Sequence, residues 1–117
     1  MRRKAEPGSG RRLVLLILGV LREAPLHGYA IARRIEEGSG QVFSPAEGML
    51  YPLLHQLEQA GAIASRWEHV DGRGRKVYSV TEEGKRRFEA EINLWQSETA
   101  AVIKVVGLGE GARLALG

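Results

Sequence analysis

Arginine, lysine and glycine are concentrated in one short stretch of the chain, VDGRGRKVYSVT at residues 70–81. The polar run of residues 71–76 contains Arg73, Arg75 and Lys76 together with two glycines. Guanidinium and ammonium groups bind phosphate oxygens, and glycine allows the backbone to turn sharply. Residues 77–81 then alternate like a β-strand. We interpret the stretch as a β-hairpin with a cationic tip, which suits the binding of an anion but is also common in solvated turns.

The other residue types indicate no second kind of chemistry. The chain has no cysteine, which excludes disulfides and thiolate metal sites. His27, His55 and His69 lack the spacing of metal ligands, and no nucleophile, base and orienting group occur together. We therefore expect a protein that is not an enzyme, has no catalytic residues and uses no metal or other cofactor. The absence of cysteine also fits a cytoplasmic location.

The distribution of charge favours an anionic partner. The length of 117 residues suits a single domain, and the chain has a net charge of +3 with a pI near 9.6. Residues 1–78 contain 12 Lys and Arg against 8 Asp and Glu, whereas residues 79–117 contain 5 against 6. The basic excess therefore lies in the part of the chain that contains the hairpin.

The element before the hairpin is predicted to be a helix with one apolar side. Ser44 and Glu47 have the spacing of a capping box, and the helix is expected to continue to about residue 60. Pro52 costs about 3 kcal/mol inside a helix, so we expect the regular helix to begin near Gly48 and to hold the proline in its first turn. The apolar stripe comprises Leu50, Leu53, Leu54 and Leu57, and the opposite face carries Gly48, Pro52, His55 and Gln59, flanked by Tyr51 and Gln56.

The first helix is predicted at residues 11–23 and is apolar on all sides. Such a helix must be covered by its own domain or by a second subunit. Its apolar run at residues 13–21 is too short to span a membrane. We prefer a buried helix to the core of a signal peptide, because Arg22 and Glu23 follow directly and no cleavage site is present. No membrane association is expected.

A second helix, two strands and a long last helix complete the predicted elements. Trp67, on the first strand, is expected to pack against the preceding helix. Thr81 is a suitable cap for the last helix, whose apolar positions recur at alternating steps of 4 and 3 residues. This heptad pattern indicates that the last helix pairs with another helix. The predicted ranges are 27–37 for the second helix, 41–43 for a short extended piece, 62–70 and 76–81 for the strands, and 82–106 for the last helix.

Three helices, a hairpin and a further helix indicate a winged helix-turn-helix domain with a long C-terminal dimerisation helix. The fold class is mainly α with a small β-hairpin (α+β). In this fold the third helix enters the major groove of DNA and the hairpin is the wing. We divide the chain into a flexible basic arm at residues 1–10, a DNA-binding domain at 11–81, the dimerisation helix at 82–106 and a flexible tail at 107–117.

Three motifs resemble the PadR family of bacterial winged-helix transcriptional regulators. They are LHGYAIARRIEE, EGMLYPLLHQLEQAGAI and GRGRKVYSVTEEGKRRF, and they occur in the order and spacing of the family. The resemblance covers about residues 13–106. It is closest to the small subgroup that has a single C-terminal helix.

The resemblance implies a homodimer that represses neighbouring genes and whose last helices cross to the partner. In the family, the tyrosine of the LYP motif and the cations of the wing meet the DNA backbone, and the HGY motif lies near phosphates. Placement on the second and third helices adds further candidates for DNA contact. The predicted DNA-binding residues are Tyr29, Arg33, Tyr51, His55, Gln59, Arg73, Arg75 and Lys76.

A small planar aromatic ligand is a further implication of the resemblance. In some small members a tryptophan of the last helix faces its symmetry mate and stacks aromatic compounds between the subunits, and Trp95 occupies the matching place. Simple dimer packing of Trp95 is the alternative. The predicted dimerisation residues are Leu13, Phe88, Ile92, Trp95, Val102 and Val106.

These observations lead to two hypotheses of different classes. The first is a dimeric DNA-binding repressor, in which two reading helices enter successive major grooves about 34–36 Å apart on a near-palindromic operator, with or without an effector. The second is a winged helix that serves as a protein-interaction module. It predicts little affinity for duplex DNA.

Overall fold

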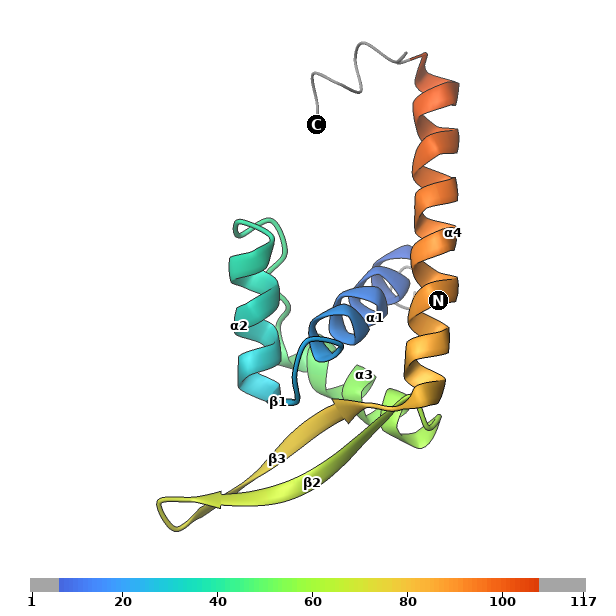
Figure 1. Ribbon diagram of the computed structural model, residues 1–117. Coiled ribbons are helices and arrows are strands. Elements are labelled where there is room, and N and C mark those ends of the chain that lie inside the picture. The colour runs from blue at the N-terminus through green and yellow to red at the C-terminus, as the bar shows by residue number, and fades with distance from the viewer. Residues whose placement is uncertain (1–6, 108–117) are drawn as a thin grey trace, which may run out of the picture.

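The computed structural model describes residues 7–107 as four helices and three strands (Figure 1). The fold class predicted from the sequence is confirmed, since the sheet is small and helices dominate. The basic arm and the tail lie largely outside the described residues, and the first helix begins four residues earlier than expected. The elements are α1 Pro7–Leu21, β1 Leu26–His27, α2 Gly28–Gly38, α3 Glu47–Gln59, β2 Ile63–Val70, β3 Arg73–Val80 and α4 Glu82–Val106.

Helix α1 lies at the centre of the hydrophobic core. Ile17 and Leu18 have no exposed surface, whereas Leu16 and Val20 are only partly buried. The domain itself therefore covers most of this apolar helix and leaves one side incompletely covered. Leu13 belongs to the core cluster of its own chain. Its assignment to the dimer surface is wrong, because it has almost no surface to offer a partner.

The sheet has three antiparallel strands in the order β1-β3-β2 rather than two. The added strand, β1, has two residues, which pair with Val77 and Tyr78 of β3. The hairpin turn consists of Asp71 and Gly72 alone, which have φ angles of 53° and 75°. Two positive φ angles are the geometry of a tight two-residue hairpin turn. The wing cations consequently lie in strand β3 and not in a loop at the tip, since pairing resumes at Arg73.

The two short helices begin differently from one another. Helix α2 is capped by His27, whose Nδ1 accepts the N–H of Ala30 at 3.4 Å. The capping box predicted for α3 is wrong, because the helix begins at Glu47 after Ala46 and has no side-chain cap. The Ser44 hydroxyl donates instead to the Glu36 carboxylate at the end of α2.

Pro52 lies in the second turn of α3 and not in the first. The helix start predicted near Gly48 therefore does not relieve the free-energy cost of the proline. Its missing N–H leaves the carbonyl oxygen of Gly48 without its helical partner. Gly48 is exposed, and water can satisfy that oxygen. The extended piece predicted at residues 41–43 is also absent, because Gly40 and Gln41 both have positive φ angles in a turn after α2.

Helix α4 has the predicted bounds and projects as a long column from the rest of the chain (Figure 1). The Thr81 hydroxyl accepts the N–H of Gly84 at 3.0 Å and lies 2.6 Å from the carbonyl oxygen of Gly61, to which it donates. Gly84 is buried against the start of β2. These contacts fix the base of α4 to the hairpin, while Gly107 ends the helix in the left-handed conformation with φ of 82°.

Candidate nucleic-acid interface

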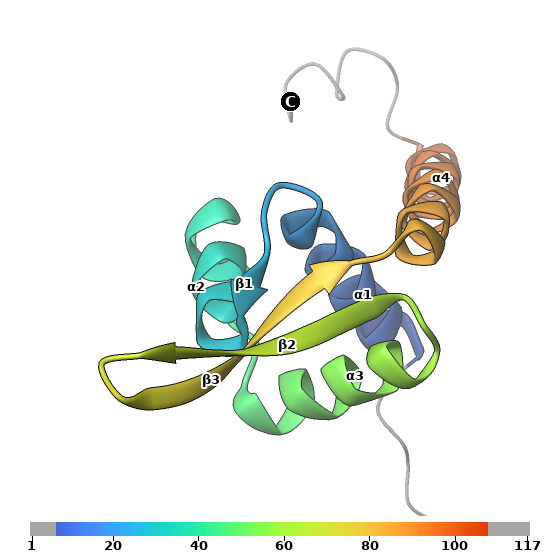
Figure 2. The same ribbon diagram turned by 60° about the horizontal axis from the view of Figure 1, so that its bottom comes forward.

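The start of α2, helix α3 and the β2–β3 hairpin border the same side of the molecule (Figure 2). Strand β2 runs back along α3 from the C-terminal end of the helix, and the hairpin continues past the N-terminal end. A hollow of about 460 Å³ lies between these elements, and we call it the wing hollow. Its lining residues are His27, Gly28, Tyr29, Tyr51, Trp67, Arg75, Lys76 and Tyr78.

Tyr51 extends from α3 across the start of α2. A Cβ atom at Gly28 would lie 2.6 Å from the Tyr51 hydroxyl oxygen and 2.7 Å from its ring, so only glycine leaves room for this side chain. Burial, with a contribution from the charge of Glu47, raises the pKa of Tyr51. The hydroxyl therefore stays protonated and can donate a hydrogen bond to an anionic oxygen.

Two exposed side chains of α2 are already joined to each other. Arg33 donates to the Tyr29 hydroxyl at 3.2 Å and forms an ion pair of 2.6 Å with Glu37. The hydrogen bonds to Tyr29 and Glu37 raise the pKa of Arg33. The structure thus places both predicted residues on the surface, but Glu37 offsets part of the charge that Arg33 could offer to a phosphate.

The wing cations differ in what they contact. Arg73 and Arg75 are exposed and form no ion pair with any other residue in the described range. Lys76 is half-buried, lies 3.5 Å from the Glu58 carboxylate of α3, and has its Nζ 5.7 Å from the centre of the Tyr78 ring. The two arginines can therefore offer full charges to an anion, whereas Lys76 is partly neutralised within the chain.

His27 joins the electrostatics of the hollow to the start of α2. Burial and the charge of Arg75 lower the pKa of His27, against a smaller opposite effect of Glu68. The neutral ring is also the form that caps the helix, since Nδ1 must be unprotonated to accept the N–H of Ala30. An anion in the hollow would oppose the effect of Arg75.

The predicted reading helix has the expected two sides. Leu50, Leu54 and Leu57 are buried and Leu53 is half-buried, whereas His55 and Gln59 are exposed. His55 and Gln59 are available to a partner along the exposed side of α3. The wing hollow adjoins the helix at Tyr51 and does not include them.

Trp67 is the residue of this region that the sequence interpretation placed wrongly. Its side chain is 65% exposed and does not pack under α3 as expected. Ile63 and Ser65 share its face of β2 and are progressively less buried, so the strand leaves the core before it reaches Trp67. No sequence signal marks that point, because the alternation of β2 gives a face but not the extent of the helix that covers it.

A second exposed region lies along α4. Phe88 packs on the core and Ile92 is half-buried, whereas Trp95, Val102 and Val106 are 44%, 59% and 60% exposed. The apolar seam predicted from the heptad pattern is therefore covered at its base and uncovered along its distal part.

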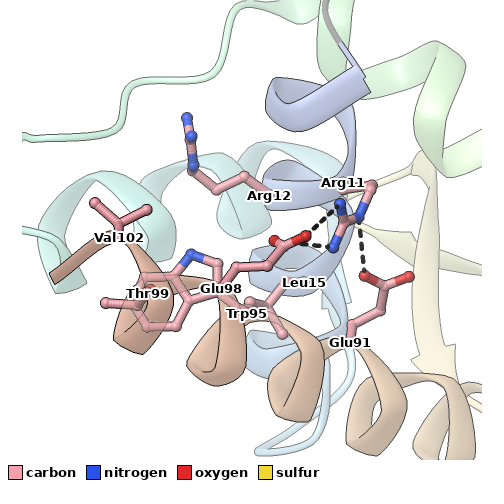
Figure 3. Close-up of a pocket in the computed structure, with 8 residues that line it drawn as sticks. All are labelled: Arg11, Arg12, Leu15, Glu91, Trp95, Glu98, Thr99 and Val102. Atoms are coloured by element: carbon pink, nitrogen blue, oxygen red, sulfur yellow. Dashed lines mark hydrogen bonds and ion pairs between the residues drawn. The ribbon is translucent and has the colours of Figure 1, made fainter. Parts of the chain in front are cut away.

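Trp95 borders two hollows, one between α1 and α4 and a larger one that α2 also lines. Figure 3 shows the smaller one, of about 140 Å³, where Arg11 contacts Glu98 at 3.4 Å and Glu91 at 3.7 Å beside the indole. The larger one, of about 490 Å³, also includes Phe88 and Ile92 and is mainly apolar. Trp95 is 44% exposed at the border of this hollow, so its indole can contact an apolar partner.

Metal sites and membrane spans are both absent from the described residues. No group of three or more His, Cys, Asp or Glu side chains within residues 7–107 could hold a metal ion. No helix in that range is long and apolar enough to cross a bilayer.

Residues 17–90 match the family model described as Transcriptional regulator PadR-like family. The Negative transcriptional regulator PadR of Bacillus subtilis is 36% identical over 80 residues, which are 67% of this chain and 43% of the relative. The chain spans less than half the length of the first curated relatives it matches.

Solved structures show the same relationship. A PadR family transcriptional regulator from Eggerthella lenta has a TM-score of 0.74 at 33% identity, over 85% of this chain and 87% of that chain. Bacillus subtilis PadR in complex with operator DNA has a TM-score of 0.64 at 32% identity, over 69% of this chain and 47% of that chain.

Proposed function

The chain belongs to the PadR-like family of transcriptional regulators, and on that premise we propose that it binds operator DNA as a homodimeric repressor. Membership of a family of transcriptional regulators agrees with the expectation that the protein is not an enzyme. The related PadR of Bacillus subtilis has been solved with operator DNA, which supports DNA as the partner. We assign the protein to the cytoplasm, where its DNA would be.

One observation carries the proposal. The β2–β3 hairpin, which carries Arg73 and Arg75, lies alongside helix α3, which carries Tyr51 and the exposed His55 and Gln59 (Figure 2). Arg75 and the protonated hydroxyl of Tyr51 line the same wing hollow. Cations and hydroxyl groups bind phosphates and fix the register of a protein on the duplex, while a helix in the groove reads base edges. In this proposal His55 and Gln59 face the bases, and Tyr29, Tyr51 and the two arginines contact the backbone.

The dimer places two reading helices on one duplex. The exposed distal surface of α4, with Trp95, Val102 and Val106, supplies an apolar interface for a second copy. Two copies related by a two-fold axis would recognise a near-palindromic operator. The same interface offers Trp95 for stacking a planar aromatic effector, and the adjoining apolar hollow of about 490 Å³ is within the usual size of ligand pockets, about 300–1,000 Å³.

A DNA-binding assay at several salt concentrations tests the function. The DNA is the promoter region upstream of the gene itself, with a scrambled duplex as the control. A dimer that covers about 6–10 phosphates should lose about 10³–10⁵-fold in affinity between 50 and 200 mM salt. Weak binding that does not distinguish the two duplexes would contradict the proposal and would favour a protein-interaction module.

The effector is tested separately by the quenching of tryptophan fluorescence with planar aromatic compounds. Quenching that disappears in Trp95→Ala supports stacking at the dimer interface. Quenching that persists in this variant would assign the ligand elsewhere and leave Trp95 as a packing residue of the dimer.

A further inference from the structure

The exposed tryptophan of the wing has no role in the contacts proposed above. Trp67 is 65% exposed on β2 and lines the wing hollow together with Tyr51 and Arg75. An indole buries a large apolar area when it is covered, and nothing in residues 7–107 covers most of this one. Tyr29 and Tyr51, which are 61% and 42% exposed, line the same hollow, and a contiguous exposed patch of large apolar side chains is typical of a binding surface.

The strands around Trp67 fix its position. Helix α3 covers the neighbouring part of the hairpin through Glu58, which accepts a hydrogen bond from Ser65 at 2.5 Å and pairs with Lys76. Trp67 follows Ser65 on the same face of β2 and is opposite Lys76. Trp67 therefore lies just beyond the part of the hairpin that α3 covers. At this position its side chain lines the wing hollow.

Gly74 supports one side of the indole. A Cβ atom at this position would be 3.5 Å from Cε3 of Trp67 and 3.6 Å from Nε2 of His69. One edge of the indole thus lies close to β3 at Gly74, and most of the side chain remains exposed.

We propose that Trp67 packs its indole against a deoxyribose of the DNA strand whose phosphates are bound by Arg75 and Tyr51. This inference rests on the proposed function and adds to it an apolar contact. Deoxyribose rings lie between successive phosphates and present carbon atoms to a flat apolar surface. Arg75 and Lys76 line the wing hollow beside the indole, which suits a nucleic-acid backbone and disfavours a second copy of the same cationic wing.

The dependence of affinity on salt separates this contact from an ionic one. Removal of a phosphate contact reduces the steepness of the salt dependence, whereas removal of an apolar contact weakens binding equally at all salt concentrations. Trp67→Ala is expected to bind the promoter duplex about tenfold more weakly from 50 to 200 mM salt with an unchanged slope. Trp67→Phe keeps a flat ring and should recover most of the affinity.

Arg75→Gln is the matched ionic variant in the same hollow. Because the substitution removes one phosphate contact from each protomer, it should lower the slope of log K against log salt by about two. Trp67→Ala that binds like the wild type, or that changes the slope as Arg75→Gln does, would overturn the inference. Both side chains are exposed, so unfolding temperatures close to that of the wild type are expected and serve as the control for folding.

Fluorescence gives a second and independent readout. The chain has two tryptophans, so Trp95→Phe leaves Trp67 as the only one. Its emission should shift to shorter wavelength on addition of the promoter duplex, and an unchanged spectrum under saturating DNA would contradict the contact. If the wild type itself binds no DNA, both the inference and the proposed function fail. If the wild type binds and only the Trp67 results are negative, the function stands without this contact.

Discussion

The wing and the distal part of α4 each expose a tryptophan, yet their surroundings differ. Trp67 lies among Arg75, Lys76 and three tyrosines at the edge of the sheet. Trp95 lies near the apolar side of α1, and the exposed valines of α4 continue its surface toward the C-terminal end. Both side chains are far more exposed than a core residue, at 65% and 44%.

The contrast shows that an exposed aromatic side chain does not by itself identify its partner. Arg75, which forms no ion pair within residues 7–107, leaves a positive potential beside Trp67 that an anionic partner would compensate. Valines next to Trp95 leave apolar surface that is best covered by another apolar surface. Three of the charged side chains near Trp95 are paired within the chain, because Arg11 contacts both Glu91 and Glu98.

The largest effect is expected from adding charge to the apolar region. Val102→Asp/Val106→Asp should convert the proposed dimer into a monomer, because aspartates in an apolar interface lose their hydration without gaining a partner. Operator affinity should fall by about 10²–10⁴-fold, since the two reading helices no longer bind as a linked pair. Sedimentation equilibrium and titration of the duplex measure both effects.

Ser97→Asp is the control for this variant, because it adds negative charge at an exposed position of α4 outside the apolar seam. It should remain dimeric. A double variant that is still dimeric would show that distal α4 is not the interface.

A smaller effect is expected at the joint between the two regions. Gly84→Ala should lower the free energy of unfolding by about 2 kcal/mol. The added Cβ would overlap the backbone of Ala62 and lie 2.7 Å from Cγ2 of Val80. Denaturant unfolding measures the change. Gly48→Ala is the matched control, since nothing lies within 4 Å of its Cβ and it should stabilise α3 by about 0.5–1 kcal/mol. Equal stability of the two variants would contradict the packing at Gly84.

Removal of charge from the wing should weaken DNA binding at 100 mM salt by about tenfold for each phosphate that is no longer bound. Arg73→Gln/Arg75→Gln is expected to weaken binding to all sequences and to reduce the slope with salt by about 0.9 for each phosphate that is no longer bound. Lys85→Gln/Arg86→Gln removes the same charge from the base of α4 and should have little effect on either quantity. Reduced sequence discrimination with affinity intact would contradict a phosphate role for the wing.

The smallest effect concerns pH at the start of α2. The pKa of His27 is lowered in the folded chain, so the unfolded chain takes up the proton first as pH falls below about 6.5. The contribution of His27 to stability should therefore be complete above pH 6.5 and should decrease between pH 6.5 and the lower pKa of the folded state. Thermal unfolding at pH 7.5 and 5.5 measures this, with His27→Asn as a variant that can cap the helix without titrating. An equal pH dependence in that variant would exclude His27 as its source.

Elements that depend on neighbouring residues were predictable from the sequence. The Thr81 cap, the bounds of α4 and the apolar stripe around Leu54 all agree with the structure. A cap acts over three residues, and helical periodicity repeats every few residues. Family motifs likewise identified the fold, which the comparisons confirm.

The errors occurred where distant segments compete for the same residue. Ser44 has the sequence of a helix cap but bonds to Glu36 of another helix. Strand β1 is too short to have a pattern and exists because β3, about 50 residues later, offers an edge. Leu13 belongs to the core through packing that apolar composition does not specify.

The sequence by itself determined which residues are apolar, charged or able to cap a helix, and therefore the order and type of the main elements. Only the tertiary structure decided which of those residues remain uncovered. Trp67 is exposed because the hairpin extends beyond the cover of α3, and Lys76 is partly neutralised because α3 brings Glu58 to it. Burial and charge pairing depend on what the chain places alongside a residue, and local sequence carries no record of that.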